Sequence, residues 1–292
     1  MRKKSAFLLL ALLAACLIGT AALAEESQTS LAIEMHPGEI MAAPKAEAWE
    51  SSDEQVATVD AQGNITGVGE GACQITATTG GVPTVYTLTV DKNVPTELLK
   101  KAIAVAENEF ITLDGKGVKK ANKYTQWYAK KKGVEFGWCG AFVGWCFEEA
   151  GIPMSRVEKA EKVADDVTWA ISEASVGKIL KGYQKMERTT NIPRPGYMVI
   201  YSVRKRSYNN IHTGMVADVQ DLGDGRYLLT TIEGNVSSRV KKYQYYYDSS
   251  AEATQAEKNM EALPEDMQVD EKVSYKLHSK DWFIKVFCQT YK

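Results

Sequence analysis

A cysteine at the expected start of a helix is the first feature of this sequence that could do chemistry. The residues between Gly137 and Gly151 read as one helix that begins at Cys139. Gly137 permits a tight approach before this helix, and Gly151 supplies a stop after it. The start of a helix offers unpaired N–H groups and the positive end of the helix dipole, and both favour a thiolate. The pattern therefore predicts Cys139 as a nucleophile. The alternative is one more small buried residue, like Cys146.

A thiol nucleophile needs an imidazole to take its proton and a polar group to orient that imidazole. The chain contains three histidines. His36 belongs to the N-terminal region, and His278 is expected on a surface strand where only Asp281 could serve as an acid partner. His212 is therefore the strongest candidate for the base, against the alternative of a strand histidine that bonds only to the backbone.

A hairpin is predicted to bring the orienting groups to this histidine. Its turn is expected at residues 223–224, because the Asp-Gly pair at 224–225 favours a tight turn. His212 would then face Asn235 on the partner strand, with Glu233 as a diagonal neighbour on the same face. The length of the loop leaves the register open by a residue or two, but strand alternation keeps Glu233 and Asn235 on one face. The predicted catalytic set is these three residues with Cys139.

Aromatic residues precede the cysteine and could line a substrate site. Tyr124 and Trp127 lie just ahead of the predicted helix, and Trp138 adjoins the cysteine itself. Packing in the core is the alternative for these rings and is slightly favoured for those ahead of the helix. All three are candidate substrate-binding residues.

The remaining elements of this region follow from apolar periodicity and from breaks at proline and glycine. Helices are predicted at 96–109 and 157–174, and strands at 197–203, 212–220, 227–235 and 282–291. The charged segment 248–272 is expected to form a surface helix or a mobile insertion. Cys288 is expected to be buried.

Residues 30–90 have a different character. Short period-two runs separated by Gly and Asn turns predict a small antiparallel β-sandwich, followed by a connector at 91–95. Nothing in it carries chemistry, because His36 has no second metal ligand or acid partner at useful spacing. The predicted domains are a leader at 1–24, the sandwich and linker at 25–95, and an α+β domain at 96–292.

The first 24 residues have a basic start, an apolar stretch and an Ala-Leu-Ala sequence ending at Ala24, typical of a secretory signal peptide. A lipoprotein-like box ending at Cys16 is the less favoured alternative, with lipid anchoring at that residue. No other apolar run approaches the ~20 residues needed to cross a bilayer, so no transmembrane anchor is expected in the mature chain. These features predict a secreted protein.

Charge and cysteine content narrow the function further. The chain carries 35 basic and 37 acidic side chains, and loss of the leader would make it more acidic. This balance argues against a nucleic-acid partner. The cysteines are too few and scattered for a disulfide framework. Cys139 and Cys146 lie about 10 Å apart along the predicted helix, too far to form a bond with each other.

Five segments together resemble the successive motifs of the CHAP family of cysteine, histidine-dependent amidohydrolases and peptidases. They are 122–127, 138–146, 193–196, 212–216 and 231–235. Their order, Cys then His then Glu-x-Asn, is also that of the family, and the resemblance covers roughly 98–245. Residues 49–78 in turn resemble the bacterial immunoglobulin-like domain of group 2.

The resemblance implies a papain-like α+β fold with the cysteine helix packed on an antiparallel sheet, behind an immunoglobulin-like sandwich. It implies hydrolysis of amide bonds in peptidoglycan, as an amidase or a stem-peptide endopeptidase, without a metal or a cofactor. By position, Cys139 would be the nucleophile, His212 the base, Glu233 the orienting acid and Asn235 a further polar member.

Two departures from the family concern loop geometry: Tyr197 stands where Asp is usual, and residues 210–211 replace the usual Asp-His. Alternatives are a non-catalytic wall-binding or adhesion protein, and a secreted cysteine peptidase or toxin that acts on another substrate. The sandwich would act as a spacer or as a module for attachment to the cell surface.

Overall fold

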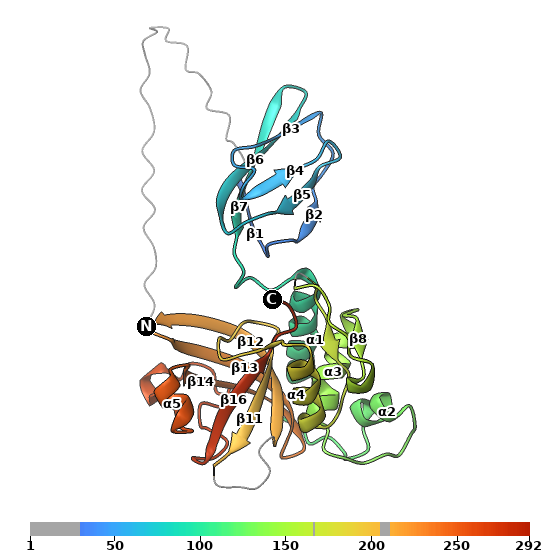
Figure 1. Ribbon diagram of the computed structural model, residues 1–292, viewed down its shortest axis with the longest axis vertical. Coiled ribbons are helices and arrows are strands. Elements are labelled where there is room, and N and C mark those ends of the chain that lie inside the picture. Colours follow the sequence, from blue (N-terminus) through green and yellow to red (C-terminus); the bar gives the residue numbers. More distant parts are fainter. Residues whose placement is uncertain (1–29, 166, 205–210) are drawn as a thin grey trace, which may run out of the picture.

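The structure is a computed structural model that describes residues 30–165, 167–204 and 211–292. A β-sandwich stands at one end of a larger α+β domain (Figure 1). The predicted leader, including Ala24 and Cys16, lies outside the described residues, as does Asn210. Within the described ranges, no helix combines the length and the apolar character needed to cross a membrane.

The N-terminal domain has two facing sheets. The first has the order β1 (Ser30–Met35), β7 (Val82–Val90), β6 (Gly71–Thr79) and β3 (Ala48–Ser51), and the second has β2 (Ile40–Ala42), β5 (Asn64–Gly67) and β4 (Ala57–Val59). Ile65, Ile75 and Leu88 are buried between them, and Cys73 joins this core. The predicted sandwich is confirmed, but β1 runs parallel to β7, so its pairing is not wholly antiparallel as predicted. The chain passes from β1 into the other sheet and returns beside β1 only with its last strand.

The C-terminal domain is built on a seven-stranded antiparallel sheet. Its order is β10 (Thr189–Thr190), β16 (Trp282–Cys288), β11 (Met198–Val203), β12 (His212–Gly223), β13 (Arg226–Val236), β14 (Arg239–Asp248) and β15 (Met260–Ala262). Every residue of β11 is buried, so both faces of this strand are covered. The last strand is confirmed as β16, and Cys288 is buried as expected.

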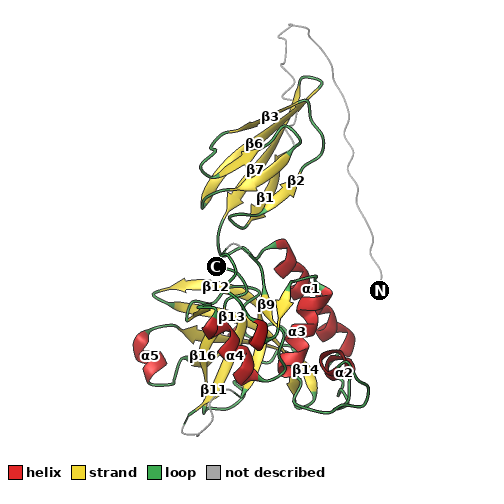
Figure 2. Cartoon of the chain, turned by 45° about the vertical axis from the view of Figure 1, so that its right-hand side comes forward, coloured by secondary structure: helices red, strands yellow, loops and turns green. Residues whose placement is uncertain are grey.

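Helices accompany this sheet. They are α1 (Glu97–Leu113), α2 (Lys123–Ala129), α3 (Cys139–Glu149), α4 (Val176–Lys185) and the short α5 (Ala251–Gln255). Helices α1, α2 and α3 lie together beside the sheet, and α5 lies on the opposite side of the domain (Figure 2). The predicted helices at 96–109 and from Cys139 are confirmed, which establishes the mixed α+β class.

The helix predicted at 157–174 is wrong. In the described part of this segment the chain forms a 3₁₀ turn at Val157–Lys159 and a two-residue strand, β9 (Ala170–Ile171), which pairs with β8 (Met154–Ser155). Its carbonyl groups are bonded from outside the segment, since the guanidinium of the buried Arg188 donates to several of them. Long-range hydrogen bonds from a side chain therefore replace the backbone hydrogen bonds of the helix that the apolar periodicity predicted.

The charged segment 248–272 also joins the sheet. It contains α5, which buries no residue, and β15, which pairs with β14. The buried Asn259 carboxamide bonds the backbone of Ile284 in β16 through both its nitrogen and its oxygen. The segment thus combines a surface helix with a tether to the core.

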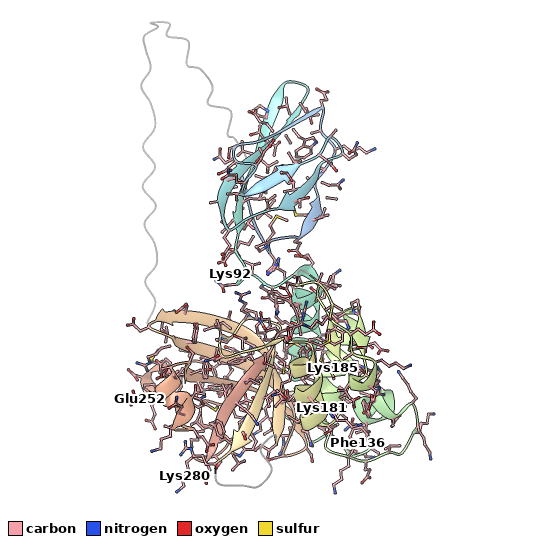
Figure 3. The ribbon with its side chains drawn as sticks, in the orientation of Figure 1. Lys92, Phe136, Lys181, Lys185, Glu252 and Lys280 are labelled. Carbon is pink, nitrogen blue, oxygen red and sulfur yellow. The ribbon has the colours of Figure 1, made fainter. Side chains whose placement is uncertain are left out.

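The two domains meet through a few specific contacts. Lys92 marks the connector between them (Figure 3). The carboxylate of Glu39 accepts the N–H of Glu97, at 2.6 Å, where α1 begins. In a second contact, the buried ring of His36 stands edge-on to the ring of Tyr291, with the ring centroids 4.6 Å apart. The sandwich therefore supplies an anion to the helix start, where Thr96 makes no side-chain cap.

Close packing fixes α3 against the sheet. A Cβ at Gly234 of β13 would lie 2.5 Å from Phe142 of α3, and one at Gly140 would lie 2.6 Å from the carbonyl of Ala174. The two glycines thus allow backbone to approach backbone on either side of the helix. Because its neighbours surround it, α3 is buried along most of its length, from Cys139 to Phe147 except at Trp145.

Candidate active site

The first turn of α3 positions the thiol. Cys139 is the first helical residue, as predicted, and the preceding Trp138 makes no side-chain cap. The first N–H groups of a helix have no partners within it, so an indole at this position leaves them available to an anion. Cys139 is only 6% exposed, so access to the sulfur is narrow.

The β12–β13 hairpin brings the imidazole and the carboxylate together. Its turn lies at Asp224 and Gly225, one residue later than predicted, but the register shifts twice along the strands. Near the site Met215 pairs with Ile232, which is the predicted register. The two register shifts therefore restore, near the site, the pairing that was predicted from a turn placed one residue too early.

A chain of hydrogen bonds runs from the thiol to the carboxylate. Nε2 of His212 lies 2.8 Å from Oε2 of Glu233, and the ring also bonds the thiol of Cys139. Because Nε2 is occupied by Glu233, Nδ1 is left for the sulfur. All three residues are buried. The structure thus brings together three of the four predicted catalytic residues.

The carboxylate of Glu233 is held on both oxygens. Oε1 accepts the hydroxyl groups of Tyr201 at 2.6 Å and Thr231 at 2.7 Å. A Cβ at Gly214 would lie 2.5 Å from its Cγ, so the neighbouring strand packs directly on the side chain. Burial alone would raise the pKa of Glu233, but the charge of His278 and the bond from His212 hold it well below its usual range.

This environment favours an ion pair between sulfur and imidazole. Burial would raise the pKa of Cys139, but its hydrogen bond with His212, the charge of that ring and nearby backbone N–H groups lower it. Burial would likewise lower the pKa of His212, but the Cys139 thiolate and then Glu233 raise it to about 10. Both shifts therefore favour the thiolate and the imidazolium as the charge state of this pair.

Alkylation should be selective for Cys139. Because its pKa is lowered, the rate with iodoacetamide is expected to level off well below pH 8.5, the usual range of a free cysteine. Burial raises the pKa of Cys146 and Cys288, so these should stay unmodified in the folded chain. Rates measured from pH 4 to 10, with the labelled peptide identified by mass spectrometry, check this. A Cys139 rate still rising steeply above pH 8.5 would contradict the ion pair.

His278 is where the sequence-based prediction fails most clearly. It was expected on a surface strand, but its side chain is 5% exposed and its Nε2 lies 2.9 Å from Oε2 of Glu233. The residue follows a connection that returns from the edge strand β15 toward β16. No local signal marks it, because its partner Glu233 lies far away in the sequence.

Within the described ranges, His212, Glu233 and His278 could also hold a metal ion, since their ligand atoms lie within 4.8 Å of one another. Both nitrogens approach the same carboxylate oxygen at 2.8 and 2.9 Å. Contacts between the protein groups themselves account for these distances.

Asn235, the fourth predicted member, lies beside the cysteine turn. Its backbone has φ +65°, a left-handed conformation that asparagine tolerates better than most residues. Its amide nitrogen would lie 3.6 Å from a Cβ at Gly137. Both residues line a groove of about 360 Å³ that also includes Phe136, labelled in Figure 3. The structure therefore places Asn235 at the groove, while Glu233 takes the bond to His212.

The three candidate substrate-binding aromatics lie in or near the core. Trp138 and Tyr124 are each 1% exposed and stack on each other, with centroids 5.1 Å apart. Trp127 is half-buried, and its ring would meet a Cβ at Gly144 of α3 at 2.9 Å. Only Trp138 also contributes to the lining of the groove. In this conformation these rings mainly support the helix that carries Cys139.

Fold and site together define a class: an α+β domain of papain-like type, in which a cysteine at a helix start faces histidine and glutamate on an antiparallel sheet. Residues 129–235 match the family model of the CHAP domain, and residues 39–90 match that of the bacterial Ig-like domain (group 2). The chain thus contains a CHAP domain preceded by a bacterial Ig-like domain. No curated protein matches the chain. At the level of the family, a CHAP domain indicates amidase or peptidase activity of the peptidoglycan-hydrolase type.

Proposed function

We propose that the protein is a secreted hydrolase that cleaves amide bonds of peptidoglycan with Cys139 as nucleophile. The observation that carries the proposal is the buried chain of contacts from Cys139 through His212 to Glu233. A thiol, a base and an orienting carboxylate in this relation are the components of thiol catalysis. The CHAP match supports peptidoglycan as the class of substrate.

In the first half-reaction, the Cys139 thiolate, whose proton already lies on Nδ1 of His212, attacks the carbonyl carbon of the substrate. The carbonyl electrons move onto oxygen and form a tetrahedral oxyanion. Its collapse breaks the C–N bond, and His212 returns the proton to the departing amine. A thioester on Cys139 remains.

In the second half-reaction, water attacks the thioester while His212 takes a proton from it. Breaking the C–S bond releases the acid and restores the thiolate. Throughout, Glu233 keeps Nε2 of His212 protonated and the ring in one orientation. That tautomer leaves Nδ1 to exchange the proton with sulfur and substrate.

Backbone N–H groups in the first turn of α3 would stabilise the oxyanion, because Trp138 leaves them uncapped. Asn235 is the further polar member of this site. Its position beside Gly137 would let its carboxamide bond a substrate lying in the groove. The N-terminal domain would act as a spacer or attach the enzyme to the cell surface, and a signal peptide ending at Ala24 would direct export.

The test is the identity of fragments released from purified peptidoglycan. The untreated protein is expected to release soluble fragments that carry new free amines, or glycans that are separated from their stem peptides. Mass spectrometry of these fragments identifies the bond that is cleaved. Chain alkylated beforehand on Cys139 should release none. Sedimentation of both forms with the wall, without release by either from several wall chemistries, would instead support a binding or adhesion protein.

A further inference from the structure

We infer that His278 is a positioning residue that limits how strongly Glu233 holds the protonated ring of His212. The inference rests on the proposed function. His278 lies outside the segment that matches the CHAP family model, which ends at residue 235. It belongs instead to residues 270–281, which we call the strap.

Two imidazoles share one oxygen of Glu233. Nε2 of His212 and Nε2 of His278 lie 2.8 and 2.9 Å from Oε2 of Glu233. The contact of His212 is an aligned hydrogen bond, whereas that of His278 has the distance of an ion pair without that alignment. Because a second nitrogen lies at this oxygen, the negative charge of Glu233 acts on two rings and not on His212 alone.

Packing holds the ring of His278 in this place. It stacks on Trp282 with centroids 4.4 Å apart, and Tyr243 covers it at 4.1 Å. Both neighbours belong to strands of the sheet, β16 and β14. A ring fixed between two others keeps its nitrogen at Oε2 without relying on a well-aligned hydrogen bond.

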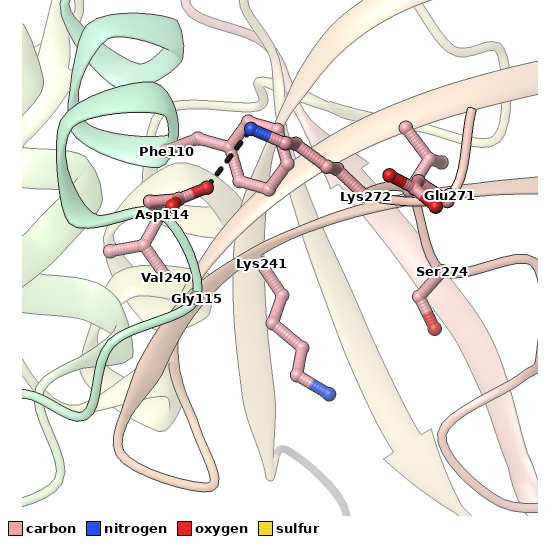
Figure 4. Close-up of a pocket in the computed structure, with 9 residues that line it drawn as sticks. Phe110, Asp114, Gly115, Val240, Lys241, Glu271, Lys272 and Ser274 are labelled. Atoms are coloured by element: carbon pink, nitrogen blue, oxygen red, sulfur yellow. Dashed lines mark hydrogen bonds and ion pairs between the residues drawn. The ribbon is translucent and has the colours of Figure 1, made fainter.

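The strap is itself tied down ahead of His278. Ser274 bonds both the carbonyl of Lys242 and the N–H of Gln244 through its backbone. Lys272 reaches across to Asp114 at the end of α1, with 3.0 Å between the charged atoms (Figure 4). A cavity of about 320 Å³ lies between these segments. The strap thus joins α1 and β14 before it delivers the imidazole.

The tyrosine neighbours of the cluster add no charge. Tyr201 of β11 and Tyr243 and Tyr245 of β14 have pKa values raised by burial first and then by the charge of Glu233, so they stay neutral. The Cys139 thiolate of α3 does act on His212 of β12 and raises its pKa ahead of Glu233. His278 changes only the second of these two contributions, because it lies at Oε2 of Glu233, where one carboxylate is divided between two imidazoles.

This division has a catalytic consequence. A carboxylate that acted on His212 alone would bind the imidazolium more strongly. The ring would then be a weaker acid toward the departing amine, although it would hold the thiolate more firmly. His278 is expected to keep His212 acidic enough to give its proton back.

The test compares three replacements. His278→Phe keeps a ring for stacking and removes the nitrogen. His278→Gln places an amide nitrogen as many bonds from Cα as Nε2, and His278→Asn stops one bond short. With Phe and Asn, the alkylation profile of Cys139 should move to lower pH by about one unit, and kcat for fragment release should fall about three- to tenfold. Gln should show a smaller shift than Asn.

His36→Phe is the matched control, because it removes another buried imidazole from the other domain and should leave the profile unchanged. An unchanged profile for Phe and Asn, a shift to higher pH, or equal shifts for Gln and Asn would overturn the inference. If Phe does not fold, the pair Gln and Asn decides. Alkylation needs no substrate, so a shifted profile without any fragment release would reject the proposed function and its effect on kcat, while the influence of His278 on the hold of Glu233 on His212 would still be supported.

Discussion

Replacing Cys139 with alanine is expected to abolish release of peptidoglycan fragments, with a rate at least about 10⁴-fold below that of the original chain. The nucleophile forms the thioester, and none of the other thiols in the described residues is placed to take over its role, since Cys73 is buried in the N-terminal domain. Cys146 and Cys288 are completely buried, and burial raises the pKa of both. Release measured by mass spectrometry over several days would detect the residual rate. Sedimentation with the wall should be unchanged, because binding does not need the sulfur.

Cys146→Ala is the control matched to this variant, since it removes a thiol from the same helix. Cys146 packs in the core, so the change should lower the free energy of unfolding by about 1–2 kcal/mol. Its rate of fragment release should stay within about threefold of the original. Rapid release by Cys139→Ala would show that another group is the nucleophile.

Replacing Glu233 with glutamine should lower kcat/KM by about 10⁴-fold while the chain stays folded. The amide oxygen can still accept the hydroxyl groups of Tyr201 and Thr231. The amide nitrogen would then face Nε2 of His212, so two N–H donors would oppose each other. The ring can avoid this only by moving its proton to Nδ1, and in that tautomer it cannot accept the proton of Cys139.

The alkylation profile of Cys139 should reveal this change without any substrate. In the original chain the raised pKa of His212 and the lowered pKa of Cys139 both favour the thiolate. With the carboxylate gone, the imidazolium loses its anion and the thiol holds its proton longer. The rate should therefore rise only at higher pH, toward the range of an ordinary cysteine.

Glu173→Gln provides a matched control, because Glu173 is another buried carboxylate, bonded to the hydroxyl of Tyr128 at 2.7 Å. It should lose stability but keep the alkylation profile and a rate within about threefold of the original. A Glu233→Gln variant with an unchanged profile would show that Glu233 does not act on His212.

Features whose causes are local could be predicted from the sequence. A glycine before Cys139 and another after the helix were enough to predict the start of α3, because helix ends depend on nearby backbone. Alternation along the hairpin put Glu233 on the face of His212, and the register near Met215 agrees. The turn was predicted one residue early, since the sequence does not show where strands bulge.

Features that depend on contacts between residues distant in the sequence could not be predicted in this way. Helical periodicity predicted a helix at 157–174, but Arg188 donates hydrogen bonds to backbone carbonyl groups of this segment. The described part of the segment forms a 3₁₀ turn and a short strand instead. The packing of α3 buried Trp138 and Tyr124, whereas the sequence left core and substrate wall open. His278 reaches Glu233 because β14, β16 and α1 hold the strap in place. Short-range patterns determine which residues can react, but burial and the sharing of one carboxylate arise only when separate segments pack together.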